Sequence, residues 1–390
     1  MIIRKVEAFP FRANRDNAEG LGTAGSPSLL QPGQARYRWA ETYPVLYSMD
    51  FETALVRLTL EDGTIGWGES QAPVAPEVAC TIIDRILAPV LEGTDLDPTP
   101  QGIAELWWTM YNTMRVRGQT GGFMLDAIAG IDIALWDCVG KLRSLPVSTL
   151  CSEVSAPALS AVPAYLSGLP SGDPECVRPF HQGGFDCVKI FFQSATVDVL
   201  LQHCDRVQQI LGPNGKIAVD ALWRLTPESA RHLAPELATR QILFLESPLA
   251  PESALAHAGL ARDIETPIAI GESYRTVFEL ETFFTASAMG VVQPDIGRTG
   301  ITEALRIAER ARGLGITVIP HVSIAMGPQL AAAIHFAAAV HCPMLEYNPS
   351  VLNVANRYLR EPLVLEHARY LVPQKPGLGI DLHDFAGRTV

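Results

Sequence analysis

Eight short apolar runs between residues 159 and 346 are the feature that most constrains how this chain can fold. Helix-length segments separate the runs, among them Ile301–Leu314 and Pro227–Thr239. The second of these has Thr226 as its predicted N-cap and a proline in its first turn. Buried strands that alternate with helices are typical of an α/β protein, and eight such units favour a closed (β/α) barrel of the TIM type. An open doubly wound sheet is the alternative, but no Gly-x-Gly-x-x-Gly turn follows a strand. The runs are SAVPAYL, FDCVKIFF, KIAVD, ILFLE, PIAIGE, GVVQPD, GITVIPH and PMLE.

Residues 1–150 have a different pattern, typical of an α+β unit. The alternating runs TALVRLTL and TIGWGES flank the turn sequence EDG, which predicts a hairpin. Residues 76–145 have helical periodicity, including IAGIDIALWDCVGKL, whose apolar residues share one predicted face. Residues 13–43 are rich in Gly, Pro, Ser and Gln, and a stretch this long without periodicity is usually functional or mobile. We expect one domain over residues 1–150 and a barrel domain over residues 151–356.

The charge balance limits the partners of the protein. Its 390 residues include 30 Lys and Arg against 42 Asp and Glu, a net charge of −12. Nucleic acid and anionic membranes need a basic footprint, so neither is expected as a partner, and an anionic substrate needs a local cation. The longest apolar stretch, residues 331–340, is too short to span a bilayer, which takes about 20 residues. The seven cysteines are scattered and include no C-x-x-C pair, which predicts reduced thiols. The N-terminus does not resemble a secretory signal, so we expect a cytoplasmic protein.

Titratable residues recur at the ends of the apolar runs. From the first of these residues to the last, the intervals are 26, 26, 23, 26 and 25 residues. Each interval is about the length of a strand, a helix and two loops. Each therefore occupies the same place in successive units, at the carboxyl end of the strands where catalytic groups of this fold lie. A single acidic residue after a strand is more often a helix cap or a solvated loop residue, but six in phase are hard to explain in that way. They are Asp220, Glu246, Glu272, Asp295, His321 and Glu346.

Three of these residues, Asp220, Glu246 and Glu272, are predicted on adjacent strands. Their carboxylates would repel one another unless a cation neutralises them. Oxygen ligands favour a hard ion, and Mg²⁺ takes a few carboxylates while it leaves positions for water and substrate. The alternative is that the carboxylates pair with nearby arginines. The pattern predicts a magnesium site.

The remaining residues of the series are candidates for the chemistry itself. Asp295, on the strand before His321, can hold one histidine tautomer and raise its basicity, which makes His321 a candidate general base. The alternative is that His321 has only a structural role, but its regular spacing from the carboxylates of the series argues against this. Lys189 shares a strand face with Phe191 and could bind a substrate carboxylate, or act as a second base if burial lowers its pKa. Glu346 could hydrogen-bond an enolate oxygen as a carboxyl group kept protonated by its surroundings.

Taken together, these motifs resemble the enolase superfamily in its mandelate racemase-like subgroup, over essentially the full length. They include TIGWGES, GIDIALWDCVGK, VKIFF, IAVD, FLESP, IGES, VVQPDIGRTGITEA, VIPH, LEYNP and PGLGI. The resemblance implies a modified barrel under an α+β capping domain that residues 357–390 complete, with residues 13–35 as a specificity loop. It also implies a homo-oligomer. The implied site has a catalytic Mg²⁺ on Asp220, Glu246 and Glu272 and a His321–Asp295 base pair.

Two departures from the family pattern bear on the reaction. Phe191 stands where the family often has a second lysine, and Leu222 stands where it often has asparagine after the metal-binding Asp220. The first departure argues against racemisation by two bases, unless Lys189 takes that role.

The reaction that we expect is removal of the proton α to the carboxylate of a small sugar acid, followed by loss of a β-hydroxyl group. This is dehydration to a 2-keto-3-deoxy acid. The alternatives are a racemase or epimerase, or a cycloisomerase that acts on a sugar acid or its lactone through the same enolate. A metal-binding barrel without catalytic activity is a further alternative.

Overall fold

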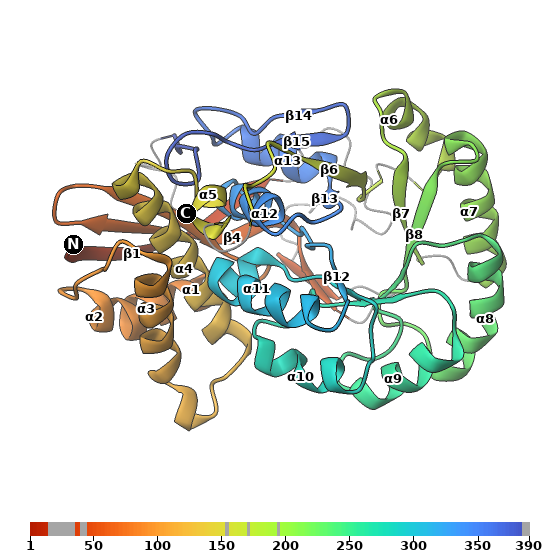
Figure 1. Ribbon diagram of the computed structural model, residues 1–390, viewed down its shortest axis with the longest axis horizontal. Coiled ribbons are helices and arrows are strands. Elements are labelled where there is room, and N and C mark those ends of the chain that lie inside the picture. Colours follow the sequence, from red (N-terminus) through yellow and green to blue (C-terminus); the bar gives the residue numbers. More distant parts are fainter. Residues whose placement is uncertain (15–35, 40–44, 153–155, 170–171, 193–195, 384–390) are drawn as a thin grey trace.

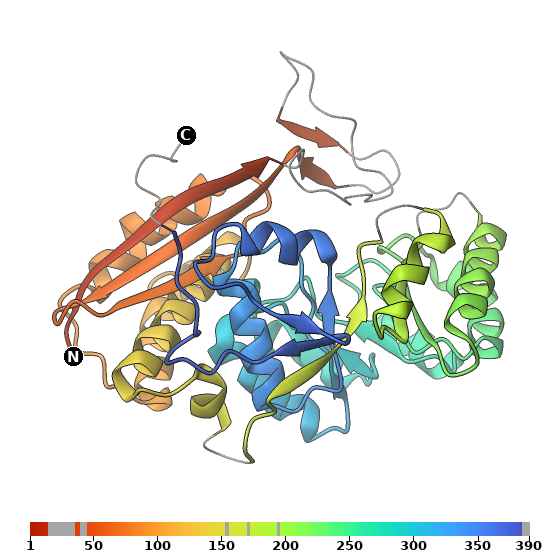
Figure 2. The ribbon, with the colours of Figure 1, turned by 90° about the horizontal axis from the view of Figure 1, so that it is seen from above.

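The computed structural model describes residues 1–14, 36–39, 45–152, 156–169, 172–192 and 196–383. Apart from its first two residues, the predicted specificity loop 13–35 lies outside the described residues. An antiparallel sheet with helices on one face lies at one end of the molecule, and a parallel sheet surrounded by helices forms the rest (Figures 1 and 2). A short hairpin, β2 (Tyr37–Trp39) and β3 (Leu46–Ser48), stands apart from both sheets (Figure 2).

The antiparallel sheet has the strand order β1 (Ile3–Asn14), β4 (Asp50–Leu60), β5 (Ile65–Ser70). Strands β4 and β5 pair as the predicted hairpin, and Gly63 supplies the left-handed conformation of the turn, with φ of +88°. The glycines of TIGWGES let helix α4 (Gly122–Arg143) lie directly on β5. A Cβ atom on Gly68 would come within 1.9 Å of the Gly130 carbonyl oxygen, so the contact requires glycine.

Helix α4 is buried on nearly its whole circumference rather than on one face. The reason is that it packs between β5 and helix α11 of the barrel (Ile296–Arg312). Its Trp136 indole donates to Thr302 Oγ1 at 3.0 Å. The prediction of a single apolar face was therefore too narrow, because a second layer covers the other side. The other helices of this half are α1 (Glu77–Ile82), α2 (Ala88–Leu91), α3 (Pro100–Asn112) and α5 (Val147–Ser152), with a π-helical turn at Ile83–Leu87 and a 3-10 turn at Arg115–Arg117.

All eight predicted apolar runs contain strands of one parallel sheet. The strands pair in chain order from β6 to β12, and β13 pairs with β6, so that the first and last strands are neighbours. This is the arrangement of a TIM-type barrel and excludes the open doubly wound sheet. The strands are β6 (Ala161–Leu166), β7 (Cys187–Phe191), β8 (Lys216–Asp220), β9 (Leu245–Glu246), β10 (Ile268–Ile270), β11 (Val291–Val292), β12 (Thr317–Val318) and β13 (Leu345–Tyr347).

Helices follow the strands and cover the outside of the sheet (Figure 1). Helix α8 has the predicted bounds, Pro227–Thr239, and Thr226 Oγ1 accepts a hydrogen bond from Ser229 N as its N-cap. Helix α11 begins at Ile296, five residues before the predicted start at residue 301, because Asp295 caps it. The other helices are α6 (Arg178–Gln182), α7 (Val197–Leu211), α9 (Ala254–Asp263), α10 (Val277–Thr285), α12 (Pro328–Ala339) and α13 (Pro349–Asn356), with a 3-10 turn at Pro174–Val177.

The interior of the parallel sheet is filled by apolar side chains that point inward from successive strands. They form a separate buried cluster, which leaves the carboxyl ends of the strands as the place for polar groups. The cluster consists of Tyr165, Cys187, Ala218, Phe244, Ala269, Val291 and Ile319.

The C-terminal segment contacts both halves of the molecule. Strand β15 (Arg369–Leu371) pairs with β6 and with β14 (Leu365–Glu366), and Leu378 N donates to Asp137 Oδ1 of α4 at 2.8 Å. We propose a division into a capping domain of residues 1–150, completed by residues 357–390, and a barrel domain of residues 151–356. Among the described residues, the helices are too short or too polar to cross a membrane.

Candidate active site

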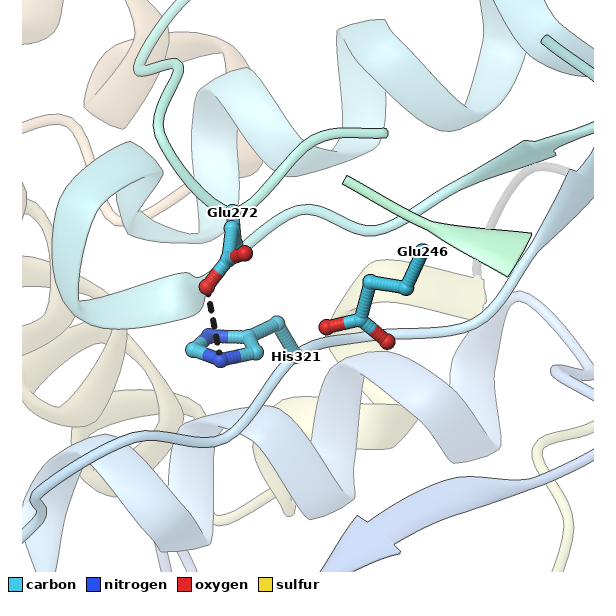
Figure 3. A group of neighbouring side chains, drawn as sticks. All are labelled: Glu246, Glu272 and His321. Atoms are coloured by element: carbon cyan, nitrogen blue, oxygen red, sulfur yellow. Dashed lines mark ion pairs between the residues drawn. The ribbon is translucent and has the colours of Figure 1, made fainter. Parts of the chain in front are cut away.

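The titratable residues that recur in the sequence lie together at the carboxyl ends of the barrel strands. Asp220 ends β8 and is the cross-strand partner of Glu246, which ends β9. Glu272 lies two residues after Ile270, the last residue of β10, and a single β-bridge pairs Asp295 with His321. Figure 3 shows Glu272 and His321 pointing toward each other, with Glu246 beside them. The recurrence in the sequence is therefore a convergence in space.

Lys189 lies at the centre of the carboxylates. Its Nζ is 2.9 and 3.1 Å from the two carboxylate oxygens of Glu246, 2.8 Å from Glu346 Oε1 and 3.8 Å from Asp220 Oδ2. Burial lowers the pKa of Lys189, but Glu246 and Glu346 together raise it well above its ordinary value. The condition for Lys189 to act as a second base, a lowered pKa, is therefore not met. The side chain is held as an ammonium ion.

The surroundings of Glu346 favour its ionised form, which argues against the predicted protonated carboxyl group. Burial raises the pKa of Glu346, but Lys189 and His321 lower it to about 2. Its Oε2 also accepts a hydrogen bond from Val322 N at 3.0 Å. The sequence placed Glu346 in the site but could not show that Lys189 and His321 both face it.

The two ring nitrogens of His321 face different partners. Nδ1 lies 2.8 Å from Asp295 Oδ2, while Nε2 lies 3.1 Å from Glu272 Oε2 and 3.9 Å from Glu346 Oε2. Burial lowers the pKa of His321, but Glu272, Glu346 and Asp295 raise it to about 10. The Asp295 carboxylate is fixed in turn, because its Oδ1 accepts a hydrogen bond from Gly297 N at 3.0 Å. One nitrogen is thus held by Asp295, and the other is directed at the carboxylate cluster.

The donor set fits a divalent cation. Among the described residues, the ion pairs of the site join two cationic side chains, Lys189 and His321, to five carboxylates. Four of these are buried, Asp220, Glu246, Asp295 and Glu346, and Glu272 is partly buried. Burial and then Glu246 raise the pKa of Asp220, and burial raises that of Glu272. Excess buried negative charge of this kind is what a bound cation compensates.

The tightest group of possible ligands differs from the predicted set by one residue. Within the described part of the chain, donor atoms of Glu246, Glu272 and His321 lie within 4.8 Å of one another. Asp220 is outside that group, and its Oδ1 accepts a hydrogen bond from Leu222 N at 2.9 Å. The assignment of Asp220, Glu246 and Glu272 as the metal ligands remains a prediction.

Sequence reasoning missed several neutral side chains that hold the charged ones. Gln293 Nε2 donates to Glu246 Oε2 at 2.9 Å, Ser247 Oγ donates to Glu272 Oε1 at 3.0 Å, and Gln329 Nε2 donates to Asp295 Oδ1 at 3.1 Å. Gln293 and Ser247 directly follow barrel strands, so their position was a usable signal. Gln329 lies in the first turn of a helix, and the sequence carries no comparable sign of its role.

Two family descriptions match the chain. Residues 40–151 match the mandelate racemase / muconate lactonizing enzyme N-terminal domain, and residues 175–386 match the enolase C-terminal domain-like family. The chain belongs to the enolase superfamily, in its mandelate racemase-like subgroup. This confirms the resemblance that the sequence motifs indicate.

Relatives within the superfamily agree with this assignment. The chain is 29% identical to the arabinonate dehydratase of Saccharolobus solfataricus, with 85% of this chain and 89% of the relative covered. It is 30% identical to the D-galactarolactone cycloisomerase of Agrobacterium fabrum, with 84% and 88% covered. A solved structure of an enolase superfamily member from Agrobacterium tumefaciens superposes with a TM-score of 0.89 at 30% identity, covering 99% of this chain and 97% of that one. The protein is therefore an enzyme of a superfamily that includes both lyases and isomerases.

Proposed function

We propose that the enzyme removes the proton α to the carboxylate of a small sugar acid and then expels the β-hydroxyl group. The product is a 2-keto-3-deoxy acid. The observation that carries this proposal is the orientation of His321, with Nδ1 on Asp295 and Nε2 directed at the carboxylate cluster. A histidine oriented by an aspartate, next to a site for a positive ion, is suited to proton abstraction from a carbon acid.

The proposed cofactor is Mg²⁺, held by Asp220, Glu246 and Glu272. When bound, it offsets the second negative charge that develops on the substrate carboxylate as the α-carbon loses its proton. Lys189 remains an ammonium ion and contributes a second positive charge close to the same place. A cation on Glu272 would also weaken the interaction between Glu272 and His321, and so remove a large part of what raises the pKa of His321.

The proposed steps balance without a further reactant. The C2–H bond breaks, its proton passes to His321 Nε2, and its electron pair enters the carboxylate as an enediolate. The C3–O bond then breaks as that electron pair returns to form the C2–C3 double bond. The leaving hydroxide takes the proton from His321 and departs as water. The resulting enol converts to the 2-keto acid.

Elimination is favoured over two-base racemisation by Phe191. Its ring centroid lies 5.3 Å from Lys189 Nζ, at the strand position where the family often has a second lysine. Glu246 and Glu346 also raise the pKa of Lys189, which opposes its use as that base. His321 is then the one residue in the proposed machinery that can both take a proton and return it.

Cycloisomerisation is the second candidate function, and the similarity to a D-galactarolactone cycloisomerase favours it specifically. It shares the first step with dehydration and differs in what happens to the enediolate. The two reactions differ in whether water is lost, so the products distinguish them.

The test is incubation of the enzyme and Mg²⁺ with a panel of aldonic acids, aldaric acids and their lactones in D₂O. We expect 2-keto acid to form from at least one aldonic or aldaric acid, and His321→Asn to abolish both this product and α-deuterium exchange. Exchange or isomerisation by the wild-type enzyme, with no 2-keto acid from any substrate, would show that the enzyme is an isomerase. The proton NMR spectrum reports both outcomes in one experiment.

A further inference from the structure

We propose that Gln329 is a positioning residue for the His321–Asp295 pair, and that Glu69 in strand β5 of the antiparallel sheet fixes Gln329. The inference rests on the proposed function in one respect, since it takes His321 as the base. It assigns a catalytic consequence to two buried residues that do not touch the substrate site. Glu69 and Gln329 are 0% and 2% exposed.

Gln329 holds the carboxylate oxygen of Asp295 that does not face the histidine. Its Nε2 donates to Asp295 Oδ1 at 3.1 Å, and Gly297 N donates to the same oxygen at 3.0 Å. The other oxygen, Oδ2, lies 2.8 Å from His321 Nδ1. With Oδ1 held by two donors, rotation of the Asp295 carboxylate is opposed, and Oδ2 stays directed at the imidazole. The direction of Nε2 toward the reacting carbon depends on this arrangement.

The contact between Gln329 and Asp295 requires a glycine beside it. A Cβ atom on Gly297 would come within 2.2 Å of Gln329 Oε1 and 2.7 Å of Nε2. Within the described residues, Oε1 has no hydrogen-bond partner. The side-chain amide of Gln329 therefore packs against the backbone of Gly297. The hydrogen bond from Nε2 to Asp295 is the polar contact that accounts for the orientation of this amide.

Glu69 fixes the helix turn that carries Gln329. Helix α12 begins after Gly327, which has no side chain to cap it. Glu69 supplies the missing acceptors, because its Oε1 accepts from Met326 N at 2.6 Å and its Oε2 from Gln329 N at 3.0 Å. A carboxylate at a helix N-terminus is favourable for the exposed N–H groups and for the helix dipole.

The end of β5 contacts a second helix start as well. Gln71 N donates to the Gly297 carbonyl oxygen at 2.8 Å, in the first turn of α11. The antiparallel sheet thus contacts the beginnings of both helices that follow Asp295 and His321 along the chain. A change in the position of this sheet would be transmitted to the base pair through Gln329 and Gly297.

The first test is Gln329→Met, which keeps the length of the side chain and removes the donor to Asp295. We expect kcat to fall by roughly tenfold to a hundredfold with KM little changed, because the base is misdirected while substrate binding is intact. Gln208→Met is the matched control, since Gln208 also donates an amide hydrogen bond but to backbone carbonyls near the start of β8, at the opposite end of the strands. It should leave kcat unchanged.

A second pair of variants tests the same contact by steric means. Gly297→Ala should reduce kcat because its Cβ displaces Gln329, and Gly297→Ala combined with Gln329→Ala should be no worse than Gln329→Ala alone. Independent effects that multiply in the double variant would contradict the proposal. Glu69→Gln should also lower kcat. The glutamine amide has one NH₂ group in place of an acceptor oxygen, so either Met326 N–H or Gln329 N–H would face a donor and lose its hydrogen bond.

The readout that does not depend on turnover is the downfield proton resonance of His321 Nδ1. We expect Gln329→Met to shift or broaden it and Gln208→Met to leave it unchanged. If Gln329→Met keeps both the resonance and the kcat of the wild type, the proposal is overturned. If the wild type lacks dehydratase or exchange activity, the proposed function fails, while the resonance still decides whether Gln329 orients the pair.

Discussion

Lys189 and its partners illustrate what governs individual residues in this site. The ammonium group contacts Glu246 and Glu346 and lies near Asp220, all of them buried. Residue type alone suggested a lysine that burial could convert into a base. The geometry reverses this, because the carboxylates of Glu246 and Glu346, at hydrogen-bond distance, outweigh the loss of solvation in setting the pKa of Lys189.

Replacing Lys189 by Met should destabilise the metal-free enzyme by about 3 to 5 kcal/mol, because two buried carboxylates lose their counter-ion. Urea unfolding measures the change. Lys216→Met is the matched control, since Lys216 is an exposed residue at the start of the neighbouring strand β8. An unfolding midpoint equal to that of the wild type would show that Lys189 does not compensate these carboxylates.

His335 provides a prediction about pH that does not involve the active site. Ser148 N donates to its Nδ1 at 3.1 Å, and its Nε2 lies 3.0 Å from the Leu378 carbonyl oxygen. Burial lowers the pKa of His335 from 6.5 to about 4. The unfolded chain therefore binds a proton at a pH where the folded chain does not.

Because the folded pKa of His335 is depressed, its contribution to stability is present above pH 6.5 and is lost as the pH falls toward 4. We expect this residue alone to reduce the free energy of unfolding by about 2 kcal/mol between pH 7 and pH 5. His335→Gln should be less stable at pH 7 but should lose less stability on acidification, as measured by urea unfolding. The exposed His232→Gln should follow the wild type, and a wild-type slope in His335→Gln would contradict the assignment.

At the scale of single elements, helix α11 shows how a residue of a neighbouring helix can cap an interruption within a helix. Its backbone leaves the helical conformation at Gly300, which has a φ of +67°. Asp132 of α4 then accepts hydrogen bonds from Ile301 N at 2.7 Å and Thr302 N at 3.0 Å, in the manner of an N-cap. The sequence predicted a helix from residue 301, which is where this second part begins.

Gly300→Ala should destabilise the fold by about 2 to 4 kcal/mol, since it combines a left-handed conformation with a Cβ atom only 2.5 Å from Asp132 Oδ2. Thermal or urea unfolding measures the effect. Gly313→Ala at the end of the same helix is the control, because its φ is −61° and the nearest atom beyond its chain neighbours, the Arg310 carbonyl oxygen, is 3.5 Å from the added Cβ. Equal stability of the two variants would contradict the role assigned to the interruption.

At the scale of the whole molecule, the carboxylate cluster links cation binding to stability. If Mg²⁺ binds the folded chain and not the unfolded chain, it should raise the free energy of unfolding by about 2.7 kcal/mol at a concentration one hundred times its Kd. Differential scanning calorimetry with and without Mg²⁺ measures this. Glu272→Gln should lose the effect, whereas Glu175→Gln, which changes an exposed carboxylate paired with arginines, should keep it. Stabilisation that persists in Glu272→Gln would place the ion elsewhere.

The predicted homo-oligomer and the predicted cytoplasmic location concern the whole molecule and remain predictions. Light scattering after size-exclusion chromatography gives the mass in solution directly. A mass equal to the 42.3 kDa of one chain would contradict the predicted oligomer.

Much of the architecture and the membership of the site could be read from the sequence. Each of the eight apolar runs became a barrel strand because a buried parallel strand is short, apolar and followed by a helix. The recurrence of Asp220, Glu246, Glu272, Asp295 and His321 placed them at one end of the sheet for the same reason. Local pattern and strand order were sufficient for these features.

The tertiary structure alone decided the states of these groups and the residues that hold them. Lys189 is held as a cation and Glu346 as an anion because of neighbours far away in the chain. Gln329 reaches Asp295 because helices α11 and α12 pack against each other, and Glu69 reaches the start of α12 because strand β5 packs against that helix. Strand and helix periodicities are local properties of a sequence. Ionisation and side-chain orientation depend on distances between segments, which the fold alone sets.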